Sequence, residues 1–221
     1  MEGLIIKNIS NDYTVKTNND IYVCKARGKF KKDKITPLVG DYVTFDEENN
    51  YIMKIHKRKN YLIRPSVANI DQALVVTSVK SPSLDTNLLD KLLTIISYNN
   101  IEPIICFTKL DLLSPNEKKE IDNYIKYYKK IGYIVVTNSN KDNFKDLFKN
   151  KITALTGQSG AGKSSLLNLL NPNLQLKTNE ISKSLNRGKH TTRHTELYEL
   201  FNGFIVDTPG FSNVDFHNMS K

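Results

Sequence analysis

Residues 157–164 have the spacing of a phosphate-binding loop and read Gly-Gln-Ser-Gly-Ala-Gly-Lys-Ser, which fits the pattern G-x-x-x-x-G-K-[ST]. Glycines let successive backbone N–H groups curl around phosphate oxygens, and the helix that follows adds positive potential at its N-terminus. We expect Lys163 to reach the β- and γ-phosphates as a catalytic residue, and the Ser164 hydroxyl to bind Mg²⁺. The predicted phosphate contacts are Gly157, Gln158, Ser159, Gly160, Ala161, Gly162, Lys163, Ser164 and Ser165.

A second phosphate motif lies downstream, where Asp207-Thr-Pro-Gly210 fits D-x-x-G after the apolar stretch 204–206. The Asp207 carboxylate is expected to hold Mg²⁺ through a water molecule, and the Gly210 N–H to sense a γ-phosphate. This short pattern is common by chance, and its position after an apolar strand strengthens it.

A base-recognition motif is predicted at Thr108-Lys-Leu-Asp111, which resembles the N/T-K-x-D motif of GTPases and follows the apolar stretch 104–107. An ionised carboxylate only accepts hydrogen bonds, so Asp111 can take both the N1–H and the exocyclic amine of guanine. Adenine lacks this pair of donors, so the motif favours guanine. Further contacts are expected from the Lys109 stem and from the turn 137–139. The predicted base-site residues are Thr108, Lys109, Leu110, Asp111, Thr137 and Asn138.

Composition places these motifs in a soluble globular chain of 221 residues with a net charge of +9. No apolar run is long enough to cross a bilayer and no signal-peptide pattern opens the chain, so neither membrane association nor secretion is expected. Cys24 and Cys106 lie in apolar stretches and are predicted to be buried thiols in a reducing cytosol. The positive charge fits a polyanionic partner such as RNA. It fits equally well a genome whose base composition enriches all its proteins in Lys and Asn.

Residues 1–66 have period-two alternation between turns, which predicts a small closed β barrel. An OB-fold and an SH3-like barrel both fit this pattern. Residues 67–221 alternate apolar strands with helical periodicity, which predicts an α/β domain with a mostly parallel sheet. A helix is predicted after Ser114, with Glu117 completing a capping box and Gly132 ending it. Asn202-Gly203 predicts a hairpin turn.

A basic segment of the barrel is a candidate RNA contact, with one aromatic residue among its cations. A solvated lysine-rich surface is the alternative. A second cluster lies at 57–59. The predicted RNA-binding residues are Arg27, Lys29, Phe30, Lys31 and Lys32.

The order of the motifs is unusual, because the base motif at 108–111 precedes the phosphate loop at 157–164. A sheet keeps its geometry when a chain is cut and rejoined at the surface, so this order predicts a circular permutation.

These features together resemble the ribosome small-subunit-dependent GTPase family, RsgA, over nearly the whole chain. The resemblance implies an α/β P-loop GTPase domain, circularly permuted, preceded by a small all-β OB-fold barrel. It also implies GTP/GDP and Mg²⁺ as ligands, and a cytoplasmic enzyme that hydrolyses GTP during late maturation of the small (30S) ribosomal subunit. A monomer is expected. The supporting segments are 40–43, 64–71, 157–168, 188–192 and 207–211.

The same resemblance implies Thr191 or Thr192 as a Mg²⁺ ligand. Phe211 stands where Ras-like enzymes carry a water-positioning Gln, so we expect slow intrinsic hydrolysis with His190 as the candidate for positioning water. We expect the segment 177–194 to become ordered by γ-phosphate and Mg²⁺. Family members continue into a C-terminal zinc domain, and no zinc site is expected within these 221 residues.

Two other functions remain open from sequence. The protein could be an RNA-interaction module that uses GTP as an ordering ligand with negligible turnover. It could also be a P-loop ATPase or kinase, which competition between GTP and ATP would reveal.

Overall fold

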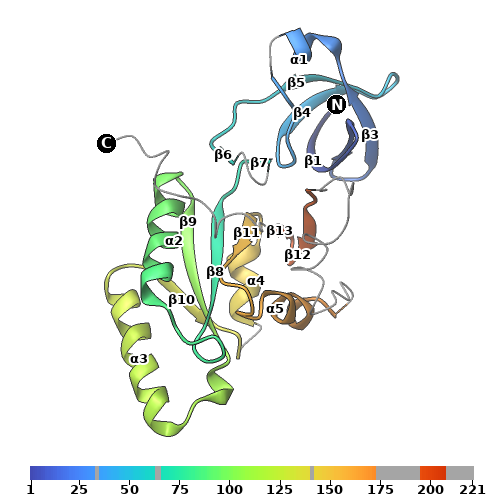
Figure 1. The fold of residues 1–221 in the computed structure, drawn as a ribbon. Helices are drawn as coiled ribbons and strands as arrows, with labels where there is room; N and C mark the ends of the chain where they lie inside the picture. The colour runs from blue at the N-terminus through green and yellow to red at the C-terminus, as the bar shows by residue number, and fades with distance from the viewer. Residues whose placement is uncertain (33–34, 63–65, 140–141, 173–194, 208–221) are drawn as a thin grey trace, which may run out of the picture.

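The computed structural model describes residues 1–32, 35–62, 66–139, 142–172 and 195–207. Figure 1 shows a small barrel, formed by the N-terminal strands, above a larger layered α/β part. The predicted division at residues 66 and 67 stays a prediction.

The barrel consists of β1 (Glu2–Ile9), β2 (Asp12–Lys16), β3 (Ile21–Ala26), β4 (Tyr42–Asp46) and β5 (Tyr51–Ile55). These strands close in the order β1-β2-β3-β5-β4, and only the β3–β5 pair is parallel. Alternate side chains point inward, so Tyr13 and Val15 of β2 pack with Phe45 and Ile52 in the core. This five-stranded order is that of an OB-fold, which confirms the barrel and decides between its two possible types.

The basic segment contains the short helix α1 (Gly28–Lys32). Phe30 is the one apolar residue of this helix, and the helix turns its ring into the barrel core, where it is 8% exposed. Stacking on a base requires an open ring face, so the expectation that Phe30 contacts RNA is wrong in this structure. Arg27 and Lys29 are exposed, and the side chains of Lys31 and Lys32 lie outside the described part.

A six-stranded sheet forms the second part, in the order β10-β9-β8-β11-β13-β12. All its pairs are parallel except β12–β13, as predicted. Its central strand β8 is buried along its whole length, as a strand covered on both faces must be. The strands are β8 (Gln72–Ser78), β9 (Glu102–Thr108), β10 (Ile134–Thr137), β11 (Ile152–Thr156), β12 (Tyr198–Leu200) and β13 (Gly203–Asp207).

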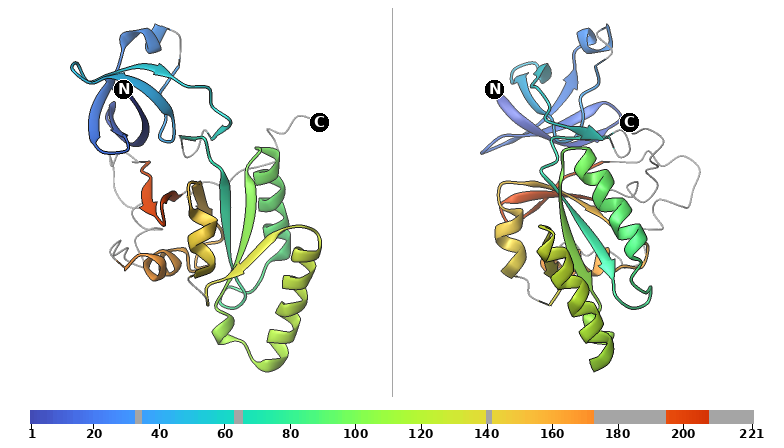
Figure 2. Two further views of the ribbon diagram at one scale, coloured as in Figure 1. Left: turned by 180° about the vertical axis from the view of Figure 1, so that it is seen from behind. Right: turned by 90° about the vertical axis from the view of Figure 1, so that its left-hand side faces the viewer.

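Helices cover both faces of this sheet (Figure 2). Ala73 and Val75 of β8 share a core with α2 (Thr86–Tyr98) and α3 (Pro115–Lys130). Leu74 and Val76 point to the other face and share a core with α4 (Asp142–Phe148) and α5 (Lys163–Leu170). The permuted chain therefore builds a complete three-layer domain.

The predicted start of α3 is confirmed. Ser114 is the N-cap, and its hydroxyl and the Glu117 carboxylate each accept the other residue's backbone N–H. Gly132 follows the helix with φ +101, the left-handed conformation expected of a terminating glycine.

The hairpin between β12 and β13 is present, but its turn lies one residue earlier than predicted. Leu200 pairs with Gly203, and the turn residues with positive φ are Phe201 and Asn202. A Cβ on Gly203 would lie 1.8 Å from the Phe148 carbonyl oxygen, so Gly203 permits close packing against α4. The glycine therefore marks a close approach of two elements and not the turn itself.

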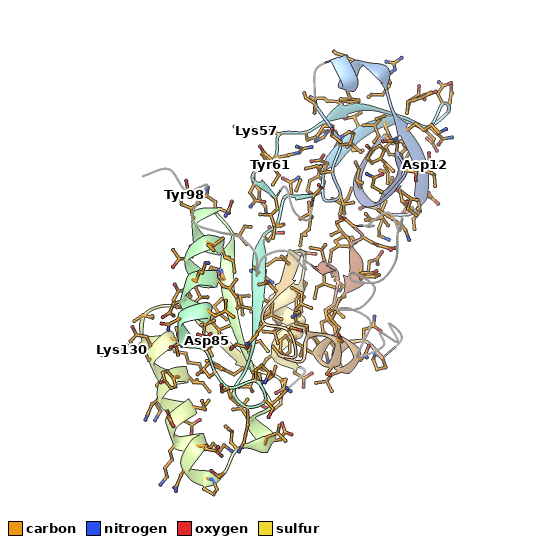
Figure 3. The ribbon with its side chains drawn as sticks, in the orientation of Figure 1. Asp12, Lys57, Tyr61, Asp85, Tyr98 and Lys130 are labelled. Atoms are coloured by element: carbon orange, nitrogen blue, oxygen red, sulfur yellow. The ribbon has the colours of Figure 1, made fainter. Side chains whose placement is uncertain are left out.

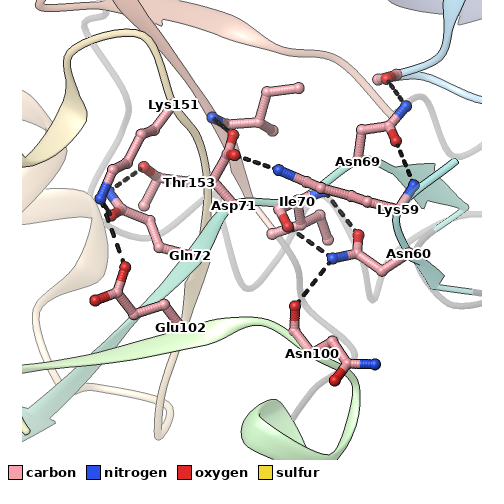
Figure 4. A network of polar contacts seen from close by, with 12 residues as sticks. Lys59, Asn60, Asn69, Ile70, Asp71, Gln72, Asn100, Glu102, Lys151 and Thr153 are labelled. Atoms are coloured by element: carbon pink, nitrogen blue, oxygen red, sulfur yellow. Dashed lines mark hydrogen bonds and ion pairs between the residues drawn. The ribbon is translucent and has the colours of Figure 1, made fainter.

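Among the described residues, the barrel contacts the α/β part in two regions. Lys7 of β1 pairs with Glu196 by a backbone bridge and by an ion pair at 2.9 Å, and the Leu197 N–H donates to the Ile6 carbonyl at 2.8 Å. The second connection runs through β6 (Tyr61–Leu62) and β7 (Val67–Ala68) to β8, and Figure 4 shows its polar network. There the Asn60 amide bonds both backbone groups of Ile70 and the carbonyl of Asn100.

Both cysteines are buried, as predicted. In the part of the chain that is described, no helix is long and apolar enough to cross a membrane. Over the same residues, His, Cys, Asp and Glu side chains do not gather into a metal-binding group.

Candidate nucleotide-binding site

The phosphate loop begins where β11 ends, at the carboxyl edge of the sheet. Gly157 has φ +135, and a Cβ there would lie 2.0 Å from the carbonyl oxygen of Val76 on the neighbouring strand. Gly160 and Gly162 also have positive φ, which side chains with a Cβ rarely adopt. The glycines of the motif are therefore required by the path of the backbone.

Lys163 is the first residue of α5, and its side chain turns back over the loop. Its ammonium donates to the carbonyls of Gly157 at 2.7 Å and Gln158 at 2.9 Å, so the loop curls around a positive charge. The first N–H groups of a helix have no partner within it, so α5 adds donors at the same place. A curled glycine loop that carries an ammonium and helix N–H groups fits a polyphosphate. Ser164, which would supply a Mg²⁺ ligand, is half-buried beside it, and Ser165 is exposed.

The base motif follows β9, two strands away from β11 in the sheet. Thr108 ends the strand and is 2% exposed, and Lys109 turns the chain with φ +64. A short 3₁₀ helix, Leu110–Leu112, then carries Asp111, whose side chain is exposed. An exposed carboxylate at this edge is open to two donors from a purine base.

Direct hydrogen bonds join the base motif to the phosphate loop. The Thr108 hydroxyl donates to the Ala161 carbonyl at 2.6 Å, and the Lys109 ammonium donates to the Gly160 carbonyl at 2.8 Å. The Lys109 ammonium also contacts the Ser81 carbonyl. Two segments that are remote in the chain therefore form one site.

The turn proposed as a third base contact lies beside the same strand. The Asn138 N–H donates to the Phe107 carbonyl at 3.3 Å, and the Thr137 and Ser139 hydroxyls are 2.6 Å apart. The structure thus brings the turn next to the base motif.

Sequence reasoning missed one segment of the site, the loop after β8. Its Ser81 carbonyl accepts from Lys109, and a Cβ on Gly160 would lie 3.5 Å from the Pro82 ring. The position of this loop in the chain could have revealed it. It follows a strand that ends at the same edge of the parallel sheet as β9 and β11.

Several predicted residues cannot be placed. Asp207 ends β13, parallel to β11, but its side chain lies outside the described part. Gly210, His190, Thr191 and Thr192 also lie outside the described residues, together with the segment 177–194 and Phe211.

Comparison with known families decides what the site belongs to. The sequence matches the family described as RsgA GTPase over residues 55–217, and the family described as RsgA N-terminal domain over residues 2–52. This chain belongs to the RsgA GTPase family. It is therefore a GTP hydrolase with a circularly permuted GTPase domain, as the resemblance implied.

Relatives with RsgA names cover almost the whole chain. The Oceanobacillus iheyensis protein named small ribosomal subunit biogenesis GTPase RsgA 2 is 50% identical over 226 residues, which cover 99% of this chain and 77% of the relative. The Bacillus velezensis protein named small ribosomal subunit biogenesis GTPase RsgA is 50% identical over 231 residues, which cover 100% of this chain and 78% of the relative.

Two solved structures have the same fold. The crystal structure of YloQ, described as a circularly permuted GTPase, gives a TM-score of 0.81 at 39% identity and covers 99% of this chain and 74% of that chain. The crystal structure of YjeQ from Thermotoga maritima gives a TM-score of 0.82 at 33% identity, and the match covers 97% of this chain and 76% of that chain. The description of YloQ as circularly permuted agrees with the order of β9 before β11 in this chain.

Proposed function

We propose that this GTPase binds the small ribosomal subunit and its rRNA and hydrolyses GTP there during late maturation of the subunit. The names of its relatives as small-subunit biogenesis GTPases support this. The net charge of +9 and the exposed Arg27 and Lys29 on an OB-fold barrel suit an RNA surface. We further propose that it acts in the cytoplasm as a monomer.

We assign guanine recognition to the base motif and phosphate binding to the loop 157–164. The observation that supports this most is the hydrogen bond from Thr108 to Ala161, because it joins the segment that carries Asp111 to the loop that carries Lys163. Asp111 accepts from the guanine edge, and the Lys109 stem packs along the base. Lys163, now held by two loop carbonyls, exchanges them for β- and γ-phosphate oxygens.

The metal assignment uses Ser164 and Asp207, with Thr191 or Thr192 from the segment outside the described residues. When bound, Mg²⁺ offsets negative charge on the phosphate oxygens. We keep His190 as the residue that positions water, since Phe211 has no polar atom for that task.

The test is phosphate release from GTP, measured with increasing amounts of purified small ribosomal subunits. We expect slow release by the protein alone and faster release with subunits. Lys163→Ala should lower turnover by about a hundredfold or more, because it removes the main charge that faces the transferring phosphate. Lys119→Ala, an exposed position on α3, is the matched control and should leave turnover unchanged.

Unlabelled ATP in the same assay separates a GTPase from an ATPase or kinase. ATP should compete with GTP only at far higher concentration. Equal competition would contradict the assignment of Asp111, and absence of stimulation by subunits would contradict the ribosomal role.

A further inference from the structure

A groove of about 590 Å³ lies at the junction between the barrel and the GTPase domain. Its walls come from the chain that links the two parts and from the C-terminal end of α2, so both domains build it. We call it the junction groove. Its lining includes Ile55 of the barrel, Arg58, Lys59 and Tyr61 of the linking chain, and Tyr98 and Asn99 at the end of α2.

Two tyrosine rings are displayed in the junction groove. Tyr61 on β6 is 55% exposed and Tyr98, the last residue of α2, is 48% exposed. Figure 3 shows both on the same side of the molecule, with Lys57 close to Tyr61. Exposed aromatic rings in a hollow offer faces on which a planar group can stack.

An arginine is fixed in place beside one of these rings. The Arg58 guanidinium makes two 2.7 Å bonds to the Asp41 carboxylate and a third to the Thr36 carbonyl, through Nε and Nη2. None of these three bonds uses Nη1, whose two N–H groups belong to the same rigid fork. The guanidinium also lies over the Tyr61 ring, 5.6 Å from its centroid, and this ring is 55% exposed.

Two cations, Arg58 and Lys59, line the groove, and none of its described lining residues is a carboxylate. Lys59 pairs with Asp71 and Arg58 with Asp41, and these two carboxylates, which are not among the lining residues, fix the cations and offset part of their charge. The hollow between α2 and α3 differs, because Asp90 and Glu120 line it.

We propose that the junction groove binds an unpaired nucleotide of RNA. Its base would stack on Tyr61 and Tyr98, and its phosphate would lie toward Arg58. This polarity follows because the C-terminal end of α2, at Asn99, repels anions, so the phosphate belongs on the barrel side. Single-stranded RNA is recognised by cationic grooves with aromatic stacking platforms, which matches this combination of groups. The inference rests on the proposed ribosomal function and adds a contact separate from the basic segment 27–32.

The experiment uses the absence of tryptophan from the chain. Tyr61→Trp places the only tryptophan of the chain in the junction groove, where it can be excited selectively over the tyrosines, and keeps a stacking ring. Titration with a single-stranded uridine octamer should quench its emission, because a stacked base quenches indole. Tyr127→Trp is the matched control, since Tyr127 is also 55% exposed but lies on α3 away from the groove, and its emission should not change.

Binding of the same labelled octamer measures the contribution of each ring. We expect Tyr61→Ala and Tyr98→Ala each to weaken it by about tenfold, while Tyr61→Phe and Tyr127→Ala leave it within about twofold. Inorganic tripolyphosphate, which has charge but no base, should not quench the emission of the Tyr61→Trp variant. Intrinsic GTP hydrolysis should stay unchanged in all of these variants.

Three outcomes would overturn the inference. One is no quenching of the Tyr61→Trp variant by the octamer together with parental affinity of both alanine variants. Another is equal quenching by tripolyphosphate, which would show an anion site without base stacking. The third is that the two alanine variants lose binding to the small subunit but keep the parental affinity for the octamer, which would identify a protein partner. Failure of the ribosomal role is distinguishable, because the parent protein would then show no stimulation by subunits whatever the groove does.

Discussion

The hydroxyl of Thr108 donates a 2.6 Å hydrogen bond to the carbonyl of Ala161, 53 positions later in the chain. Both residues are almost fully buried, with Thr108 2% and Ala161 0% exposed. The bond therefore joins the base motif to the phosphate loop away from solvent. It gives the threonine a structural role at a position where many GTPases have asparagine.

Replacing Thr108 by valine tests this link, because valine has nearly the same shape and no hydroxyl. The Ala161 carbonyl would lose its donor in a buried place, which costs about 1–3 kcal/mol. We expect GDP to bind about 5- to 100-fold more weakly by isothermal titration calorimetry. Thr108→Ser keeps the hydroxyl and should bind as the parent does. Parental affinity in the valine variant would show that the link does not support the site.

Asp111→Asn should reduce affinity for GTP by at least about a hundredfold, since the amide replaces one of the two accepting oxygens by an NH₂ group, which faces a guanine N–H donor to donor. The amide can donate to a carbonyl, so the variant should gain affinity for xanthosine nucleotides relative to GTP. Competition binding with GDP and xanthosine diphosphate measures both effects. Asp12→Asn, at an exposed barrel position, is the control. Unchanged preference would remove Asp111 from the base site.

Gly157→Ala should destabilise the protein and prevent nucleotide binding. The new Cβ would meet the Val76 carbonyl, and φ +135 is a conformation that alanine avoids. We expect a loss of roughly 1–3 kcal/mol or more in the free energy of unfolding, measured with urea. Gly28→Ala is matched to it, because nothing lies within 4 Å of a Cβ there. A change of similar size in both variants would contradict the packing explanation.

Glu117 links stability to pH. The Ser114 side chain and backbone, and then Lys80, lower the pKa of the Glu117 carboxyl from 4.5 to about 2. A lowered pKa means that the ionised form stabilises the fold above about pH 4.5, and that this contribution disappears as the pH falls toward 2. The parent should thus have a higher melting temperature than the Glu117→Gln variant at pH 7. The difference between the two melting temperatures should shrink between pH 4.5 and 2. Ser114→Ala should move this loss to higher pH. A difference that is constant with pH would contradict the linkage.

Features that depend on nearby residues could be predicted from the sequence. The capping box at Ser114 and Glu117 lies within four residues, and the glycines of the phosphate loop act on their own backbone, so both were found. The alternation of Tyr13 and Val15 likewise follows from the pleat of a strand.

Features that depend on distant residues could not be predicted. A run of cations at 57–59 gives no sign that Arg58 is held by Asp41 and Lys59 by Asp71, which leaves fewer charges for RNA than the run indicates. Phe30 turns inward because a barrel lies beside it, and no local pattern shows that. The contact between Lys109 and Ser81 needs the sheet order before it can be expected.

The bridge between Lys7 and Glu196 has a consequence for how the chain is made. The chain emerges from the ribosome N-terminus first. Lys7 of β1 therefore emerges long before Glu196, its partner 189 positions later. The barrel edge at Ile6 and Lys7 therefore gains its last backbone partner only when translation has passed residue 197. Until then, the Ile6 carbonyl of the nascent barrel lacks the hydrogen bond from Leu197.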